Sequence, residues 1–207
     1  MRSVHVVSHP IVQHNLALLR DKRTKPPEFR RLLGEIAMLM VFKATESFAT
    51  RPLRITTPMG QATGSELRHD VLVVPVLRAG LGMANAILQV IPQAQVGFVG
   101  LKRDEKTLKP VTYHESLPKN LGRFEILLVD PMLATGGSTI AALDLLHERN
   151  ACHVRMINLV CAPEGIRAVR VKYPRLAIYS AAIDTRLNER GFIIPGLGDA
   201  GDRLFGV

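Results

Sequence analysis

The stretch LLVDPMLATGGST, residues 127–139, decides the fold. Its apolar start ends at Asp130, and small residues then lead through two glycines to Ser138 and Thr139. A short continuous apolar run predicts a strand buried on both faces, and Ser or Thr beside a glycine turn is typical of a helix start. We therefore expect a strand, a turn and a helix here, which is the repeating unit of a parallel α/β sheet.

The same alternation continues on both sides of this stretch. Apolar, β-branched runs predict strands at residues 71–76, 96–101, 124–130, 154–160 and 176–183. Helical spacing predicts helices at about 82–91, 138–149 and 163–173. Strands and helices in alternation favour an α/β fold with a doubly wound, mainly parallel sheet and flanking helices. The polar segment 103–123 is too long for a simple connection, so we expect a β-arm or flap there.

The first third of the chain has a different pattern. Apolar residues recur at helical spacing over residues 11–20 and 28–49, and two prolines supply a start signal for the second helix. We expect a helical N-terminal arm over residues 1–60 and a core over residues 71–183. The chain has 207 residues, of which 47% are apolar, so we expect one domain, 1–207.

Composition argues against several classes of protein. The start, MRSVHVVSHP, lacks the long apolar segment of a secretory signal. Residues 79–101 are uncharged but contain Gly, Pro, Asn and Gln, so we interpret them as loop, helix and strand of a soluble fold. Cys152 and Cys161 have apolar neighbours, which favours buried free thiols in a reducing cytoplasm. The seven histidines show no convincing metal spacing.

The net charge of +9 is concentrated near the start of the chain. Residues 1–60 hold ten Lys and Arg against four Asp and Glu. A basic arm fits nucleic acid, whereas a basic cleft fits a phosphorylated small molecule. Because no arginine-rich run with interleaved aromatic residues is present, composition leaves this choice open.

The loop at residues 130–139 has the chemistry of a phosphate site. Its glycines let backbone N–H groups converge, its hydroxyl side chains add donors, and the helix start adds partial positive charge. It contains no lysine, so it is not the phosphate loop of ATPases. Asp130 would repel a phosphate unless the ligand also offered hydroxyls, as a sugar phosphate does. The alternative from the pattern alone is an ordinary capped helix start.

The end of the chain, FIIPGLGDAGDRLFGV (residues 192–207), contains G-x-G-x-x-G at Gly196, Gly198 and Gly201. This spacing is that of a dinucleotide-binding fingerprint. Only six residues follow Gly201, however, which leaves no room for the helix that would hold the pyrophosphate. An exposed flexible tail is also unfavourable, because its large apolar side chains would remain in water. We expect this backbone to pack close to another part of the molecule.

Several motifs together carry a family resemblance. VDPMLATGGS resembles the phosphoribosyl-pyrophosphate (PRPP) loop of the type I phosphoribosyltransferases. In order along the chain, VPVLRAGLGM (74–83), GLKRDEKTL (100–108), CAPEGI (161–166) and RGFIIPGLGDAGDRLFG (190–206) resemble the uracil phosphoribosyltransferases. The likeness covers nearly the whole chain.

The resemblance implies transfer of a 5-phosphoribosyl group from PRPP to N1 of uracil, giving UMP and pyrophosphate, with Mg²⁺ accompanying PRPP. It implies that Arg78 and Arg103 bind the pyrophosphate, and that the Leu77–Arg78 peptide is cis. It assigns catalytic roles to Asp130, Asp199 and Arg103. The loop residues that it implies for the 5-phosphate and ribose are Asp130, Pro131, Met132, Leu133, Ala134, Thr135, Gly136, Gly137 and Ser138.

The C-terminal segment, residues 184–207, resembles the uracil-binding hood of that family. The resemblance implies that Ile193, Gly198 and Ala200 present main-chain groups to uracil. It places Asp199 near uracil and near PRPP or its magnesium. The acceptor of the uracil N1 proton stays open between Asp199 and water.

Three positions bear on how closely the chain follows the family. Pro131 stands where many phosphoribosyltransferases have a second acid, which favours the uracil enzymes over the purine enzymes. Phe192 and Lys102 stand where the uracil family often has Tyr, so contacts by those hydroxyls and rings are not assumed.

The resemblance also bears on partners and alternatives. It implies PRPP and uracil as substrates, a homodimer or larger homo-oligomer formed through the N-terminal helices, and neither a membrane nor a nucleic acid as partner. Whether GTP activates the chain stays open, as does the choice between dimer and tetramer. One alternative is an RNA-binding regulator that keeps this fold, motivated by the basic first 60 residues. Another keeps the reaction with a different base.

Overall fold

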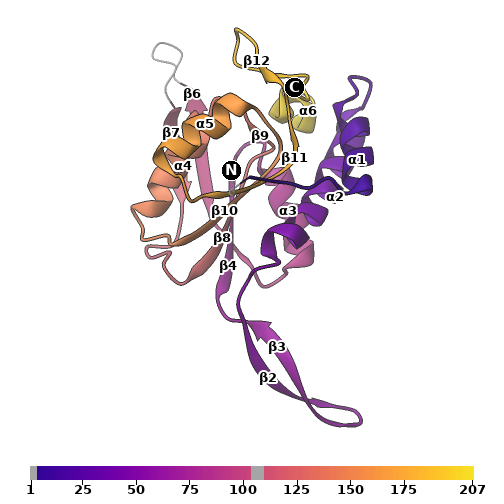
Figure 1. Cartoon of the computed structure of the whole chain (residues 1–207), viewed down its shortest axis with the longest axis vertical. Helices are drawn as coiled ribbons and strands as arrows, with labels where there is room; N and C mark the ends of the chain where they lie inside the picture. The colour runs from indigo at the N-terminus through magenta and orange to yellow at the C-terminus, as the bar shows by residue number, and fades with distance from the viewer. Residues whose placement is uncertain (1–3, 104–109) are drawn as a thin grey trace.

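The computed structural model describes residues 4–103 and 110–207, built around a central, mainly parallel sheet (Figure 1). The strand order is β1-β11-β10-β8-β4-β6-β7, and within it only β7 is antiparallel to its neighbour. The strands are β1 (Val4–Val6), β4 (Asp70–Leu77), β6 (Phe98–Arg103), β7 (Pro110–Ser116), β8 (Phe124–Val129), β10 (His153–Cys161) and β11 (Ala177–Ile183), with β5 (Gln95–Val96) beside β4 and β9 (Met132–Leu133) beside β10. All five predicted strands are confirmed.

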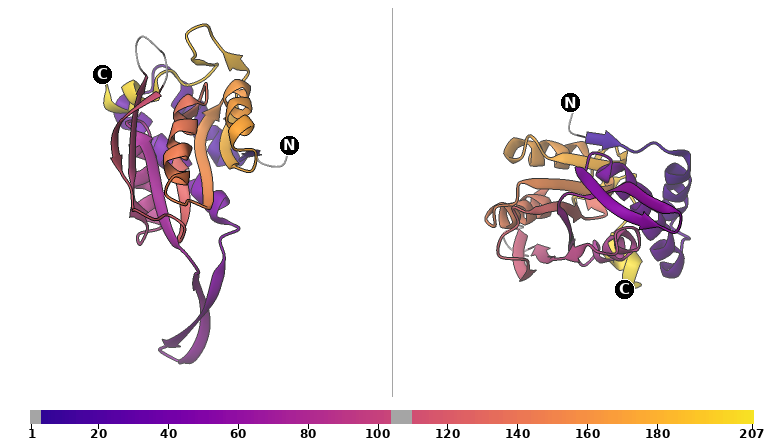
Figure 2. Two further views of the ribbon diagram at one scale, coloured as in Figure 1. Left: turned by 90° about the vertical axis from the view of Figure 1, so that its left-hand side faces the viewer. Right: turned by 90° about the horizontal axis from the view of Figure 1, so that it is seen from below.

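Helices cover both faces of the sheet, as Figures 1 and 2 show. The helices α1 (Pro10–Arg20), α2 (Pro26–Thr45) and α3 (Leu81–Val90) pack on one face, and α4 (Gly137–His147) and α5 (Pro163–Lys172) on the other. Strand β8 shows why its sequence is continuously apolar. Leu127 and Val129 belong to the core under α2 and α3, whereas Ile126 and Leu128 belong to the core under α4 and α5. The doubly wound α/β fold is therefore confirmed.

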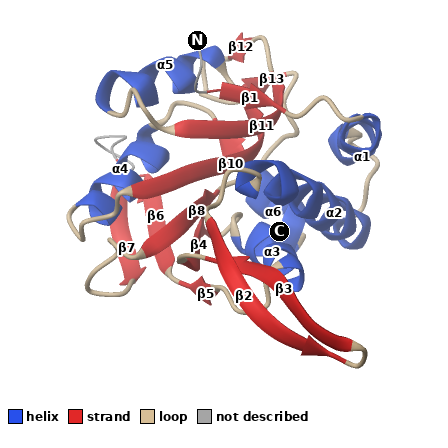
Figure 3. Ribbon diagram, turned by 60° about the horizontal axis from the view of Figure 1, so that its bottom comes forward, coloured by secondary structure: helices blue, strands red, loops and turns tan. Residues whose placement is uncertain are grey.

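Part of the predicted helical arm is wrong. Residues 50–60 are not helical: β2 (Thr50–Thr57) and β3 (Gly60–Leu67) form an antiparallel hairpin that projects from the body (Figures 1 and 3). Pro52 is incompatible with a helix interior, and the surrounding Thr and Ile residues favour an extended chain. Gly60 turns the hairpin at a positive φ of 153°. The helical arm therefore ends at Thr45.

The polar segment 103–123 contains strand β7, as the expected β-arm requires, while residues 104–109 of that arm lie outside the described residues. Together β6 and β7 form an antiparallel pair with an irregular register at Gly100 and Leu101. In the described residues, no helix is both long and apolar enough to cross a membrane. The uncharged segment 79–101 forms helix α3 and the start of β6, as we expected.

The C-terminal segment is packed against the core. It contains β12 (Arg186–Leu187), β13 (Ile193–Ile194) and α6 (Ala200–Phe205), and Leu197 and Leu204 are buried in the core beneath α2. Helix α6 has only six residues, contains Gly201 and has Asp199 as its N-terminal cap. The Asp199 carboxylate accepts a hydrogen bond from the Asp202 backbone N–H at 3.0 Å.

The prediction of two buried thiols is half correct. Cys161 is buried, whereas Cys152 is exposed. Cys152 precedes strand β10 in the turn after α4, at the end of the sheet where the apolar strand has not yet begun. Its apolar sequence neighbours therefore do not enclose it.

Candidate active site

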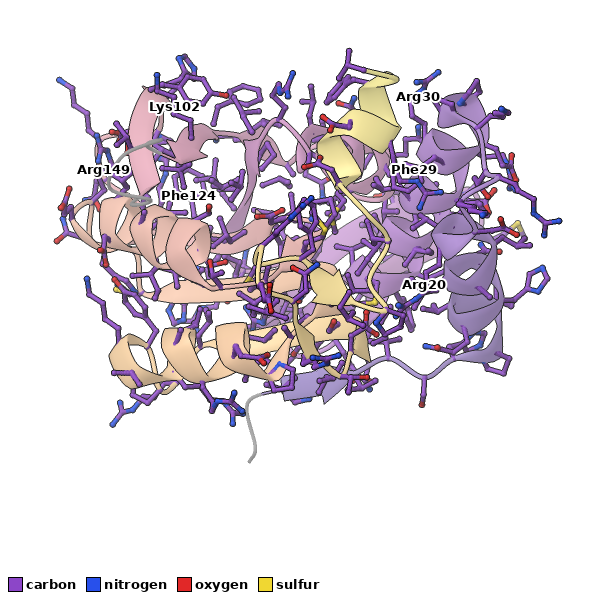
Figure 4. The ribbon with its side chains drawn as sticks, turned by 90° about the horizontal axis from the view of Figure 1, so that it is seen from above. Arg20, Phe29, Arg30, Lys102, Phe124 and Arg149 are labelled. Carbon is purple, nitrogen blue, oxygen red and sulfur yellow. The ribbon has the colours of Figure 1, made fainter. Side chains whose placement is uncertain are left out.

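Two loops far apart in the sequence meet at the carboxyl edge of the sheet. The loop after β8 and the hood line one cavity of about 330 Å³, and the hood lies across this edge in the view from above (Figure 4). The residues that line it are Asp130, Met132, Ala134, Thr135, Gly136, Ser138, Thr139, Arg190, Gly191, Phe192, Ile193 and Asp199. Parallel sheets bind ligands at this edge, where the strands end and loops converge. The cavity therefore brings together the predicted phosphate loop and part of the predicted hood.

Neighbouring backbone holds the loop after β8 in place. The Pro131 carbonyl oxygen accepts from the N–H groups of Leu159 and Val160 at 2.9 and 3.1 Å. The Leu133 carbonyl oxygen accepts from the Ala162 N–H at 2.9 Å. These bonds attach the loop to the end of β10. Pro131 and Leu133 are buried in this role and do not line the cavity, and neither does Gly137.

The turn into α4 leaves its first N–H groups available to an anion. Gly136 is the N-terminal cap residue at φ 86°, and no side chain makes a capping hydrogen bond there. The first turn of a helix has N–H groups with no partner inside the helix. Thr135, Ser138 and Thr139 add hydroxyls that face the same cavity. The ordinary side-chain capping alternative is therefore disfavoured, and the geometry is that of a phosphate cradle.

The cradle also depends on the close approach of helix α5. Gly165 of α5 packs against the loop so tightly that an added Cβ would collide with the carbonyl oxygen of Ala134. Only glycine permits this contact at that position. The position of α5 thus fixes the shape of the cradle.

Asp130 lines the cavity, and the pKa of its carboxyl is unusual. The pKa of its carboxyl is raised to about 7, chiefly by burial and to a smaller extent by the nearby negative charge of Asp199, while a hydrogen bond from the Met132 N–H acts in the opposite direction. That bond is long, at 3.4 Å, so it compensates the burial only weakly. Asp130 is therefore a carboxylate with unfilled acceptor capacity, suited to hydroxyl groups of a ligand.

A second cavity of about 740 Å³ adjoins the first and shares Met132 and Asp199 with it. Arg78 lines this half, and the Leu77–Arg78 peptide is cis, as the resemblance implied. The other residues that line it are Leu77, Ala79, Leu101, Lys102, Tyr113 and Gly201. Arg103 ends strand β6, but its side chain lies outside the described part of the structure.

The hood residues differ in how they relate to the cavities. Ile193 lines the first cavity, and Asp199 lines both. Gly198, at φ 77°, and Ala200 flank Asp199 but do not line either cavity. An added Cβ at Gly196 would collide with the Ile193 carbonyl oxygen, so this turn requires glycine.

An ion pair from the N-terminal arm anchors the hood. The Arg20 guanidinium donates to both carboxylate oxygens of Asp184 at 2.7 and 2.8 Å and to the Gly196 carbonyl oxygen at 2.9 Å. Asp184 also accepts from the Gly196 N–H at 2.9 Å. Arg203 of the hood donates to the Leu197 carbonyl oxygen and lies over the Phe29 ring. Figure 4 labels Arg20 and Phe29 beside the hood.

The sequence does not single out these anchoring residues, because they lie in three separate segments. It also does not single out Arg190 and Tyr113 as cavity residues. A signal for Arg190 exists in its position directly before the hood glycines. No comparable signal marks Tyr113.

Comparison with a distant solved structure shows a shared fold. A hypoxanthine-guanine phosphoribosyltransferase from Bacillus anthracis matches with a TM-score of 0.52 at 15% identity, covering 74% of this chain and 78% of that one, a likeness of fold alone. The chain therefore shares the α/β fold of that protein.

Closer relatives identify the family. The family model described as uracil phosphoribosyltransferase matches residues 6–207. Proteins described as uracil phosphoribosyltransferase from Dictyoglomus thermophilum and Finegoldia magna are 52% and 50% identical, over 99% and 100% of both chains. The structure of the AQ2163 protein from Aquifex aeolicus matches with a TM-score of 0.94 at 36% identity, covering 99% of this chain and 98% of that one. The chain belongs to the uracil phosphoribosyltransferase family.

The raised pKa of Asp130 predicts a pH-dependent stability. Its contribution is fully present below the unfolded pKa, about 4, and is lost as the pH rises through the folded pKa of about 7. An Asn at position 130 carries no charge at any pH, so the Asp130→Asn variant avoids the loss of stability that ionisation causes in the parent. We therefore expect the variant to melt at a higher temperature than the parent at pH 8. At pH 4.5, roughly the unfolded pKa, the gain should have largely vanished. Thermal unfolding across this range is the measurement, and a gap that does not change with pH would contradict it.

The anchor of the hood predicts a second effect. The side chain of Asp184 is 6% exposed and that of Arg20 is 21% exposed, so Arg20→Ala leaves a buried carboxylate without its partner. We expect a loss of about 3 kcal/mol in the free energy of unfolding, measured by urea denaturation. Arg23→Ala is the matched control: it removes a pair with Asp21 in which Arg23 is 85% exposed, and should change stability little. Equal losses in the free energy of unfolding for Arg20→Ala and Arg23→Ala would contradict the role of the Arg20–Asp184 pair as the anchor of the hood.

Proposed function

We propose that the chain transfers the 5-phosphoribosyl group of PRPP to N1 of uracil, producing UMP and pyrophosphate. The observation that carries this proposal is the cavity lined by both the phosphate cradle and the hood, together with the adjoining, arginine-lined cavity that shares Met132 and Asp199 with it. PRPP has a phosphate at each end of a ribose, and the base must approach the ribose between them. The two joined cavities fit that arrangement.

The cradle is assigned the 5-phosphate and the ribose. The first N–H groups of α4 and the hydroxyls of Thr135 and Ser138 would donate to phosphate oxygens. Asp130 would accept hydrogen bonds from ribose hydroxyls and so orient the ring. The remaining loop residues position these groups through their backbone.

The second cavity is assigned the pyrophosphate. Cleavage of the bond to the anomeric carbon develops negative charge on the leaving group, and Arg78 is placed to stabilise it. We also assign Arg103 to this role, as the resemblance implied. Preorganised cations and positioning would supply the rate enhancement without a covalent nucleophile.

Magnesium fits this site only together with the substrate. Among the described residues, no group of three or more His, Cys, Asp or Glu side chains could hold a metal ion. Mg²⁺ prefers oxygen ligands and is commonly held by one or two carboxylates with substrate phosphates. Asp199 is the carboxylate that lines both cavities and would assist in holding it. When bound, the ion would neutralise charge on the pyrophosphate.

The hood is assigned uracil recognition. Main-chain groups of Ile193, Gly198 and Ala200 would pair with the edge of the base, which alternates acceptor, donor and acceptor. A polar edge left unpaired costs about 1–3 kcal/mol, so cytosine, with a different donor pattern, would be rejected. Asp199 is also the hood carboxylate among the described residues that line the cavity, and we assign it or a water molecule to the N1 proton.

The test is to incubate the chain with PRPP, Mg²⁺ and one nucleobase at a time. We expect UMP from uracil, and little or no nucleotide from cytosine, hypoxanthine or guanine. The Asp130→Asn variant should lose at least about tenfold in kcat/KM at pH 8, although it melts no lower than the parent. No UMP from uracil would overturn the proposal. Salt-sensitive RNA binding by a chain that makes no UMP would favour the regulatory alternative.

We further propose a cytoplasmic homo-oligomer in which the β2–β3 hairpin makes a subunit contact. Its strands contact mainly each other and expose Leu53, Ile55 and Met59, of which Met59 is 96% exposed. An isolated two-stranded hairpin is at best marginally stable, so a second copy packed on it would stabilise it. Cys152 keeps an exposed thiol, which fits a reducing compartment.

Shortening the hairpin tests this contact. Replacing residues 54–63 with an Asn-Gly turn keeps the base of the hairpin and removes its apolar tip. We expect sedimentation velocity to show a smaller species than the parent, with unchanged circular dichroism in the helical bands. A variant that retains the parent's mass would place the contact elsewhere.

A further inference from the structure

The first cavity has an unbalanced charge for a phosphate site. The loop at residues 130–139 contains no lysine or arginine, while the carboxylates of Asp130 and Asp199 both line the cavity. A helix N-terminus contributes only about half an elementary charge. A phosphate dianion bound in the cradle therefore needs a cation from outside the loop.

Arg190 is the one Lys or Arg among the described residues that line this cavity. It lies in the hood, in the loop between β12 and β13, and lines the cavity together with the residues of the cradle. Arg78 and Lys102 line the second cavity instead. Each end of the joined cavities thus has its own basic side chains.

The backbone around Arg190 is fixed although its side chain is free. The Asn188 side-chain oxygen accepts from the N–H groups of Arg190 and Phe192 at 3.0 and 2.9 Å. The Asn188 N–H donates to the Phe192 carbonyl oxygen at 2.9 Å, and the Gly191 N–H donates to the Asn188 carbonyl oxygen at the same distance. These four hydrogen bonds hold the backbone of a tight loop that carries Arg190.

In the described part of the chain, the Arg190 guanidinium has no ion pair and no hydrogen bond. Arg20, Arg155 and Arg203 all bind carboxylates or carbonyl oxygens of the protein itself. A guanidinium that lines this cavity without a protein partner has its donors available to a ligand.

We propose that Arg190 binds the 5-phosphate of PRPP from the hood side, opposite the N-terminus of α4. This inference rests on the proposed function and adds a positively charged residue to the cradle. Arg190 belongs to the same segment that is assigned uracil, so phosphate binding would also draw the hood onto the ribose. The residue would select donors that carry a 5-phosphate over donors that lack it.

Direct binding of ribose 5-phosphate tests the assignment without requiring turnover. Arg190→Gln should weaken ribose 5-phosphate about tenfold in isothermal titration, because a charge-assisted hydrogen bond to phosphate is lost. Its affinity for pyrophosphate should stay unchanged. Arg190→Lys should recover part of the affinity, since it restores charge without the planar fork. Arg186→Gln is the matched control: Arg186 is also an exposed arginine of the hood, but it does not line this cavity.

Steady-state kinetics supply the second readout. Arg190→Gln should raise KM for PRPP about tenfold, while kcat and KM for uracil stay within about twofold of the parent. If the parent makes no UMP but its binding of ribose 5-phosphate is weakened by Arg190→Gln, the proposed function is contradicted and the assignment of Arg190 is supported. An active Arg190→Gln variant with parental affinity for ribose 5-phosphate would overturn the assignment and keep the function. Equal weakening of ribose 5-phosphate and pyrophosphate would also overturn it.

Discussion

The ion pair between Arg20 and Asp184 connects three parts of the chain that are far apart in the sequence. Arg20 ends helix α1, Asp184 directly follows the last core strand, and both bind the backbone of Gly196 in the hood. Asp184 is nearly buried, and a buried carboxylate without a partner is strongly unfavourable. The hood is therefore attached through a charge that needs the N-terminal arm for compensation. The helical arm thus supports the site although it lines neither cavity at the sheet edge.

The two cavities place different chemistry at the two ends of the site. At the cradle, hydrogen-bond donors come mainly from the backbone and from hydroxyls, and Asp130 is kept in surroundings that raise its pKa. At the other end, Arg78 and Lys102 supply full positive charges. Asp199 and Met132 lie at the junction. This separation suits a donor whose one phosphate stays bound while its pyrophosphate leaves.

Much of the fold could be predicted from the sequence, because continuously apolar strands and amphipathic helices leave strong local patterns. The cradle could be predicted for a similar reason, since Asp130 and the glycines after it are contiguous. The β2–β3 hairpin could not, because exposed strands such as Thr50–Thr57 have no buried face to impose an alternating pattern. The burial of Cys152 was wrong because apolar sequence neighbours do not show where a strand begins.

The contacts that hold the hood could not be predicted either, because Arg20 and Asp184 are 164 residues apart in the sequence and nothing local to either position marks the pair. The roles of Ile193, Gly198 and Ala200 came only from the family resemblance and stay predictions. Of these three, Ile193 lines a cavity, whereas Gly198 and Ala200 adjoin one through Asp199.

The close contact between Gly165 and Ala134 means that the anion site is shaped from behind by a helix that never touches the ligand. Any inward or outward movement of α5 would be transmitted directly to the loop backbone, because no side chain lies between them to absorb it. The packing of the buried face of α5, which includes Ile166 and Val169, therefore influences the width of the cradle from a distance. Substitutions on that face of α5 would therefore change the affinity for the phosphoribosyl donor as well as the packing of the helix.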